Sequence, residues 1–158
     1  MMMNRVSIPL EDRTKLSGAL QGLLNPLQEL VLQTKQAHWA VVGEEFQSFH
    51  LNMDELNAAY GLFVDSVAER MLALGFVPAG QVGDIAAKPV LSALPEGFVQ
   101  KGPLMSAVAD SIGAVAARVR AALAAVGGLD VVTDDLLTEM LQSMEKTLWM
   151  LAAQEVHA

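Results

Sequence analysis

Two pairs of metal-binding side chains lie four positions apart in one stretch of the sequence that otherwise has the pattern of an amphipathic helix. His50 and Asp54 occur in "FHLNMDEL", and Asp65 and Glu69 occur in "VDSVAER". At about 100° per residue, all four side chains fall on one stripe beside the apolar face of the helix. Imidazole and carboxylate groups together suit ferrous iron, manganese or zinc. The chain has no cysteine, so any metal must bind to nitrogen and oxygen.

The two pairs cannot share a metal ion within one helix. A rise of about 1.5 Å per residue separates Asp54 from Asp65 by roughly 16 Å. The stripe is nevertheless symmetric about a point between residues 59 and 60, because His50 is matched by Glu69 and Asp54 by Asp65. An antiparallel copy of this helix from a second subunit would bring each His50/Asp54 pair opposite the partner's carboxylates, as a two-fold interface requires. The spacing therefore predicts two identical metal sites between two subunits.

Other interpretations of these residues remain open at this point. Acidic pairs four apart are common on solvated helix faces, and a histidine in an apolar stripe is often a satisfied core residue. Like charges at this spacing cost a few tenths of a kcal/mol each unless a cation relieves them. His38, on the preceding helix, is placed to join the same constellation. The joint pattern favours metal binding over either alternative.

The hydrophobic pattern predicts the helices that must position these side chains. Apolar residues recur at spacings of three and four through about residues 16–40, 44–74, 104–126 and 130–154. Residues 75–103 hold four of the six prolines and five of the twelve glycines, so they form a long connection with room for one short helix. We expect an all-α, ferritin-like four-helix bundle with this connection between its second and third helices. The fold alone favours a non-catalytic helical scaffold or dimerisation module over any particular chemistry.

Length, composition and charge limit the remaining possibilities. A chain of 158 residues that is 53% hydrophobic is expected to form a single domain over residues 1–158, with residues 1–13 as a flexible N-terminal tail. No apolar run is long enough to span a membrane and the start lacks the centre of a secretion signal, so we expect a cytoplasmic protein. The formal net charge of −8 disfavours binding to nucleic acid or to anionic membranes.

Four stretches of the sequence resemble the Dps family of mini-ferritins, which protect DNA in starved or stressed bacteria. They are "TKQAHWAVVGEEFQSFHLNMDEL", "FVDSVAERMLALG", "VTDDLLTEM" and "EKTLWML", and the likeness extends from about residue 16 to residue 151. The family's metal-binding pattern is a histidine followed by tryptophan, then a second histidine and three carboxylates at fixed spacings. It is met without a gap at His38, His50, Asp54, Asp65 and Glu69.

This resemblance implies a specific activity and assembly. It implies a hollow shell of twelve subunits built from two-fold dimers, with ferroxidase sites in which one subunit supplies His38, His50 and Asp54 and its neighbour supplies Asp65 and Glu69. Each site would oxidise Fe(II), two ions together where the site holds two, with hydrogen peroxide as the preferred oxidant. The ferric product would be stored in the cavity.

The resemblance also implies roles for residues around the site. Trp39 would be an electron donor or an aromatic anchor at the interface, and Lys35 would lie near the site or be an ordinary surface lysine. The acidic residues at the start of the last helix would line a pore through which iron enters, or would cap the helix; they are Asp130, Asp134, Asp135 and Glu139.

Direct DNA binding is expected to be weak or absent. Members of the family that bind DNA commonly use a lysine-rich terminal tail, whereas Arg5, Arg13 and Lys15 here are offset by Glu11 and Asp12. The alternatives are a DNA-compacting protein associated with the nucleoid and a non-catalytic helical oligomer.

Overall fold

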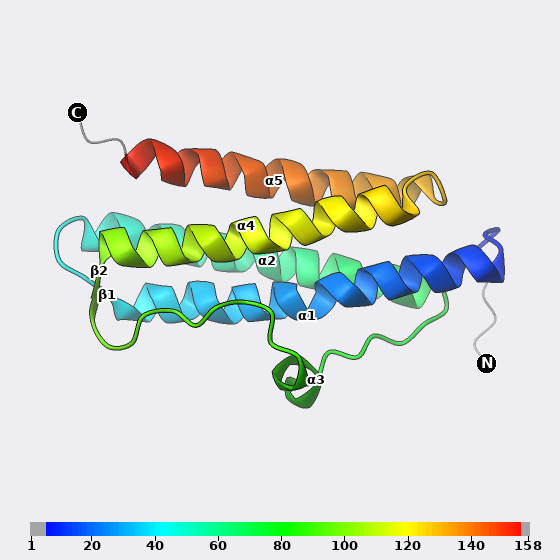
Figure 1. Cartoon of the computed structure of the whole chain (residues 1–158), viewed down its shortest axis with the longest axis horizontal. Coiled ribbons are helices and arrows are strands. Elements are labelled where there is room, and N and C mark those ends of the chain that lie inside the picture. Colours follow the sequence, from blue (N-terminus) through cyan, green and yellow to red (C-terminus); the bar gives the residue numbers. More distant parts are fainter. Residues whose placement is uncertain (1–5, 156–158) are drawn as a thin grey trace.

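Four long helices form a bundle in the computed structural model, which describes residues 6–155 of the chain (Figure 1). The elements, in chain order, are α1 (Leu10–Ala40), β1 (Val41–Val42), α2 (Phe46–Ala73), α3 (Val82–Ala87), β2 (Val99–Gln100), α4 (Lys101–Val126) and α5 (Val131–Glu155). Helix α1 packs against α2 and α4, and α4 packs against α5. The expected all-helical bundle, with a long connection that contains one short helix, is confirmed.

The bundle is held together by apolar side chains at helical spacing on the long helices. On α1 the leucines at positions 16, 20, 24 and 27 are at most 1% exposed, and on α2 Met53, Tyr60 and Val67 are fully buried. Burying one such side chain contributes about 1.5–3 kcal/mol relative to leaving it in water. Phe46, the first residue of α2, is 42% exposed.

Helix α1 begins earlier than the sequence analysis expected. It starts at Leu10, directly after Pro9, and Glu11 and Asp12 lie in its first turn, where negative charge is favourable. The guanidinium of Arg13 donates hydrogen bonds to the carbonyls of Ile8 and Leu74, and so satisfies the C-terminal end of α2. Residues 10–13 therefore belong to the bundle and not to a flexible tail. Residues 1–5 of the proposed tail lie outside the described part of the chain.

A row of polar side chains on α1 fixes the path of the long connection between α2 and α4. The buried carboxylate of Glu29 accepts hydrogen bonds from the backbone amides of Val90 and Leu91, each at 3.0 Å. The other contacts are made to backbone groups of residues 79, 80, 84 and 92 by Gln21, Gln28, Asn25 and Gln33, respectively. The connection, including α3, is thus bound to the outer side of α1 (Figure 1).

A short parallel bridge joins the turn between α1 and α2 to the start of α4. Val41 pairs with Val99, and Val42 pairs with Gln100. The turn also needs Gly43, whose φ is +95° and whose Cα lies against the side chain of Gln100. Because this turn connects the two helices that carry His38 and His50, its conformation sets how those two side chains meet.

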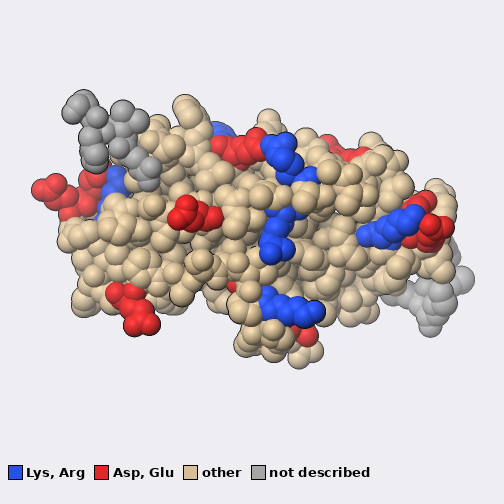
Figure 2. Space-filling view, viewed as in Figure 1, with Lys and Arg blue, Asp and Glu red and all other residues tan. Residues whose placement is uncertain are grey.

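The long helices of the described region have charged residues among their apolar ones. Within residues 6–155, none of them has a stretch sufficiently long and apolar to span a lipid bilayer. On the face shown in Figure 2, acidic and basic side chains stand among a larger uncharged area.

Candidate metal centre

His38 and His50 hold each other in one orientation at the junction of α1 and α2. Their rings are stacked, with centroids 3.5 Å apart and an interplanar angle of 23°. Nδ1 of His38 lies 2.8 Å from the carbonyl oxygen of His50, and Nδ1 of His50 lies 2.8 Å from the carbonyl oxygen of His38. A carbonyl oxygen can only accept a hydrogen bond, so each Nδ1 carries the proton. In the neutral form of each ring, the lone pair is then on Nε2, where a metal ion could bind.

The backbone at the end of α1 explains why His38 and His50 can form these reciprocal hydrogen bonds. His38 is in the last turn of α1, where carbonyl groups have no partner within the helix. The carbonyl of His38 is therefore free to accept the hydrogen bond from His50. His38 is buried and His50 is half-buried, with the ring of Phe46 tilted against His50 at 4.9 Å between centroids. The reciprocal bonds fix both rings before any metal arrives.

Asp54 and Lys35 complete the group that one subunit brings together. Oδ1 of Asp54 lies 2.5 Å from Nζ of Lys35 and 3.2 Å from Nδ1 of His38. The hydrogen bond from Lys35 lowers the pKa of Asp54, and the opposing effect of desolvation is smaller. The carboxylate is thus ionised at neutral pH and is paired with an ammonium group. The structure places Lys35 in direct contact with a predicted ligand.

Asp65 and Glu69 lie further along α2 and do not approach the histidines of the same subunit. Both side chains are exposed. Among the described residues, no three histidine, aspartate or glutamate side chains of a single chain come close enough to hold a metal ion. Within one subunit the predicted ligands therefore stand in two separate half-sets, with His38, His50 and Asp54 in one and Asp65 and Glu69 in the other.

The surface between the two half-sets is open. Ala58 is exposed, and a Cβ added to Gly61 would meet no atom within 4 Å. Leu62 is 69% exposed, although it is a large apolar residue in the middle of a bundle helix. Beside Gly61 lies a hollow of about 330 Å³ lined by residues of α1, α2 and α3 together with Gly80. Ala58 and Leu62 on this stretch of α2 are therefore accessible at the surface of the subunit.

Trp39 and the acidic residues of α5 take separate positions. Trp39 is 64% exposed and lines a different hollow, of about 480 Å³, between α1 and the long connection. Asp130 is the N-cap of α5: its Oδ2 accepts a hydrogen bond from the amide of Thr133 and pairs with Arg70 at 2.6 Å. Oδ2 of Asp134 accepts a hydrogen bond from the amide of Gly128.

Of the four acidic residues, only Asp135 and Glu139 are exposed. Asp130 therefore caps α5 within the subunit, and a pore remains a prediction for all four residues.

Several residues that shape the centre could not be identified from the sequence. The amide of Asn57 donates hydrogen bonds to the carbonyl of Val31 at 2.7 Å and to the hydroxyl of Thr34 at 3.2 Å, which fixes α2 against α1 one turn after Asp54. Arg70, next to Glu69, ties the end of α2 to the start of α5. The only sequence signal for Arg70 is its place beside a predicted ligand.

Comparison with known proteins identifies the family of the chain. A family model described as a ferritin-like domain matches residues 18–156. The chain therefore belongs to the ferritin-like family.

Within that family its relatives are Dps proteins. It is 34% identical over 143 residues to DNA protection during starvation protein 2 of Deinococcus radiodurans, which covers 90% of this chain and 59% of that protein. It is 30% identical to the structure of DpsA14 from Streptomyces coelicolor, with a TM-score of 0.92 and coverage of 99% and 94% of the two chains.

A third structure, a Dps protein from Vibrio cholerae, is described as a member of a broad superfamily of ferritin-like diiron-carboxylate proteins. It is 26% identical, with a TM-score of 0.87, and the match covers 98% of this chain and 97% of that one. The Dps resemblance seen in the sequence is confirmed.

Proposed function

We propose that this protein oxidises Fe(II) at sites shared between two subunits, uses hydrogen peroxide as the preferred oxidant and stores the ferric product in a hollow shell of twelve subunits. Its kinship with Dps proteins, one of them described as a diiron-carboxylate protein, supports iron storage and protection of DNA in general terms. The observation that carries the finer proposal is the division of ligands: His38, His50 and Asp54 meet at one end of α2, while Asp65 and Glu69 stand exposed at the other.

A second copy of α2 in antiparallel orientation would join the two half-sets. The stripe is symmetric, its centre at Ala58 and Gly61 is small enough for close backbone approach, and the exposed Leu62 needs cover. The charges are also complementary. The Lys35 ammonium lies beside Asp54 on one half-set, and two carboxylates make up the other. Each joined site would contain two imidazoles and three carboxylates.

This ligand set suits the oxidation of iron as a substrate. Imidazole and carboxylate ligands accept Fe(II), and the carboxylate charge stabilises the Fe(III) that forms. Two Fe(II) ions each lose one electron, and hydrogen peroxide takes both electrons and two protons to become two molecules of water. A two-electron reduction in one place avoids release of a hydroxyl radical. The protein contributes fixed ligands, with Nε2 of both histidines already oriented by their Nδ1 bonds.

Protection of DNA follows from the removal of iron and peroxide and needs no tight contact with DNA. Twelve copies with a formal charge of −8 each would carry −96, which opposes binding to phosphate groups. A cytoplasmic location, with or without association with the nucleoid, is part of this proposal. A shift of DNA in a gel at micromolar shell and physiological salt would contradict the expectation of weak binding.

The test is to add Fe(II) without oxygen to the purified protein, then hydrogen peroxide, and to follow iron and protein together by size-exclusion chromatography. We expect ferric iron to co-elute with a large oligomer. The Asp65→Ala/Glu69→Ala variant should lose this iron, whereas Glu96→Ala/Asp110→Ala, a pair of exposed acids outside both the predicted site and the predicted pore, should keep it. Ferric iron that precipitates apart from a small dimer or monomer would refute the proposal.

A further inference from the structure

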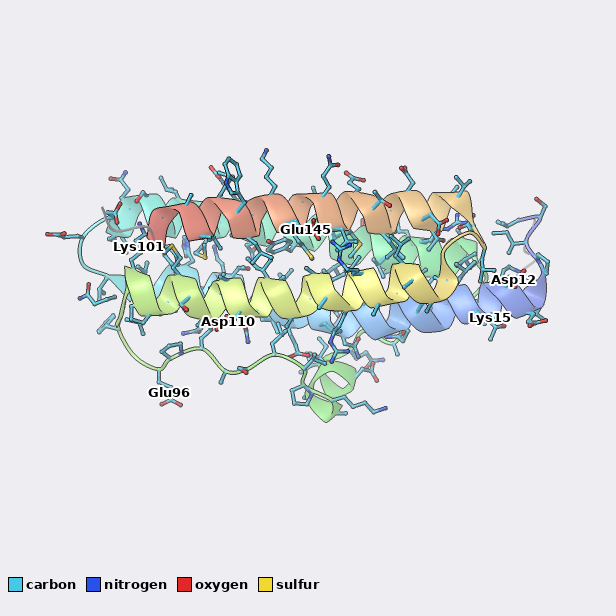
Figure 3. The ribbon with its side chains drawn as sticks, turned by 45° about the horizontal axis from the view of Figure 1, so that its top comes forward. Asp12, Lys15, Glu96, Lys101, Asp110 and Glu145 are labelled. Carbon is cyan, nitrogen blue, oxygen red and sulfur yellow. The ribbon has the colours of Figure 1, made fainter. Side chains whose placement is uncertain are left out.

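Two locally unfavourable features, one in the turn between α1 and α2 and one at the start of α4, are joined by a single ion pair. Glu45 precedes α2 with φ of 59° and ψ of 16°, a left-handed conformation that side chains other than glycine rarely adopt. Lys101 is the first residue of α4, where the helix dipole disfavours a positive charge. Nζ of Lys101 lies 2.7 Å from Oε2 of Glu45. Figure 3 labels Lys101 at this end of the bundle.

The left-handed backbone of Glu45 and the positive charge at the start of α4 are each unfavourable locally. The ion pair between Glu45 and Lys101 is the favourable interaction that they make possible. The Lys101 side chain is 14% exposed, so its ammonium group is largely removed from water and depends on its partner. Strained residues of this kind persist where the surroundings fix them, and they concentrate at functional sites. Glu45 lies between His38 and His50 in sequence, and this indicates which site the ion pair serves.

Glu45 acts on the first turn of α2 through its backbone. Its carbonyl accepts hydrogen bonds from the hydroxyl of Ser48 at 2.9 Å and from the amide of Phe49 at 3.1 Å. His50 is the next residue, and its ring must reach the carbonyl of His38 across the turn. A change in the conformation of Glu45 would rotate this turn and separate the two rings.

We propose that Lys101 is a positioning residue for the metal centre: its ion pair with Glu45 holds the turn so that His38 and His50 stay stacked with both Nε2 atoms free. This proposal rests on the proposed metal-binding function. Lys101 does not touch the ligands. It acts through the turn, together with the β1–β2 bridge that fixes the other side of the same segment.

The test is a titration of the metal-free oligomer with Co(II), a probe that binds the same kinds of ligand without redox turnover. We expect Lys101→Met to bind Co(II) about tenfold more weakly, the lower end of the range for residues that orient ligands. Lys101→Arg, which keeps the charge, should restore most of the affinity. Lys15→Met breaks a matched pair, Lys15–Glu11 at 2.7 Å, at the start of α1 and should leave Co(II) binding unchanged.

Glu45→Gly separates positioning from stability. Glycine adopts a φ of 59° without strain, which offsets part of the cost of leaving Lys101 without its partner. The melting temperature should therefore fall less than in Glu45→Ala, while Co(II) affinity should fall as in Lys101→Met. Unchanged affinity in Lys101→Met and Glu45→Gly would overturn the positioning role. A parent protein that binds no Co(II) would instead refute the metal function. The turn is then tested in the metal-free protein, where nuclear magnetic resonance should show both Nδ1–H protons in the parent and lose them in Lys101→Met.

Discussion

Replacing Asp130 with alanine should destabilise the protein more than any change among the other acidic residues of α5. The Asp130 side chain is 7% exposed, and its Oδ2 accepts hydrogen bonds from Arg70 at 2.6 Å and from the amide and hydroxyl of Thr133 at 2.9 and 2.5 Å. The Arg70 side chain is itself only 14% exposed. The substitution would therefore remove a helix cap and leave a nearly buried guanidinium without its carboxylate.

The expected loss of unfolding free energy in Asp130→Ala follows from these two missing interactions. An N-cap contributes about 1 kcal/mol, and breaking a buried ion pair by removing one partner costs about 3–5 kcal/mol. Because one oxygen atom serves both interactions, the losses do not add, and we expect about 3–5 kcal/mol in total. The stability of Asp130→Asn should lie between those of the parent and of Asp130→Ala, since the amide oxygen still caps the helix. Asp135→Ala, at an exposed position of the same helix, should change the free energy of unfolding by less than about 0.5 kcal/mol.

The assay is urea unfolding of each variant at one subunit concentration, repeated over a range of pH. Burial raises the pKa of Asp130, but the hydrogen bonds from Thr133 and the pairing with Arg70 outweigh it and hold the pKa below its usual value. A lowered carboxyl pKa contributes stability above the unfolded value of about 3.9 and loses it as the pH falls through the folded value. The difference in free energy of unfolding between the parent and Asp130→Ala should therefore become smaller below about pH 4. A loss under about 1 kcal/mol at pH 7 would refute the assignment of Asp130 as a structural residue.

Three further substitutions test other parts of the structure. Glu29→Ala should cost about 1–3 kcal/mol for each amide left without an acceptor, and should speed hydrogen exchange at Val90 and Leu91. Tyr60→Phe should change stability by less than about 1 kcal/mol, because its buried hydroxyl, whose pKa is raised to about 12, has no hydrogen-bond partner of normal geometry among residues 6–155. Lys35→Met should strengthen Co(II) binding up to about fivefold by freeing Asp54, whereas weaker binding would show that the ammonium group supports the site.

Most of the bundle could be predicted from the sequence because its signals are local. Helical periodicity predicted the four long helices, including the break between about residues 126 and 130, and the clustering of proline and glycine predicted the long connection. Gly128 has φ of +83° in the break before α5, and a Cβ at Gly127 would lie 2.5 Å from the carbonyl oxygen of Leu123. The cap at Asp130 also follows from a local rule. The spacing along α2 predicted that one chain holds two separate half-sets of ligands.

The remaining features depend on residues far apart in the chain. The sequence analysis placed the start of α1 too late, because Arg13 has the character of a charged tail residue in the sequence. Its hydrogen bond to the carbonyl of Leu74, which ties it to the bundle, exists only in the folded chain. The reciprocal bonds of His38 and His50 depend on backbone carbonyl groups, which leave no mark in the sequence. The pairing of Glu45 with Lys101 joins positions 56 residues apart. Such contacts are set by tertiary packing, which no local pattern encodes.

Mixing two inactive variants tests the shared-site account most directly. His50→Ala/Asp54→Ala and Asp65→Ala/Glu69→Ala should each fail to oxidise Fe(II). When both are produced together in equal amounts, half of the two-fold dimers contain one subunit of each kind, and each such dimer has one complete site and one empty site. The account predicts recovery of about a quarter of the parent's peroxide-dependent Fe(II) oxidation. No recovery in a mixed oligomer of normal size would contradict it, because a site built within one subunit cannot be restored by its neighbour.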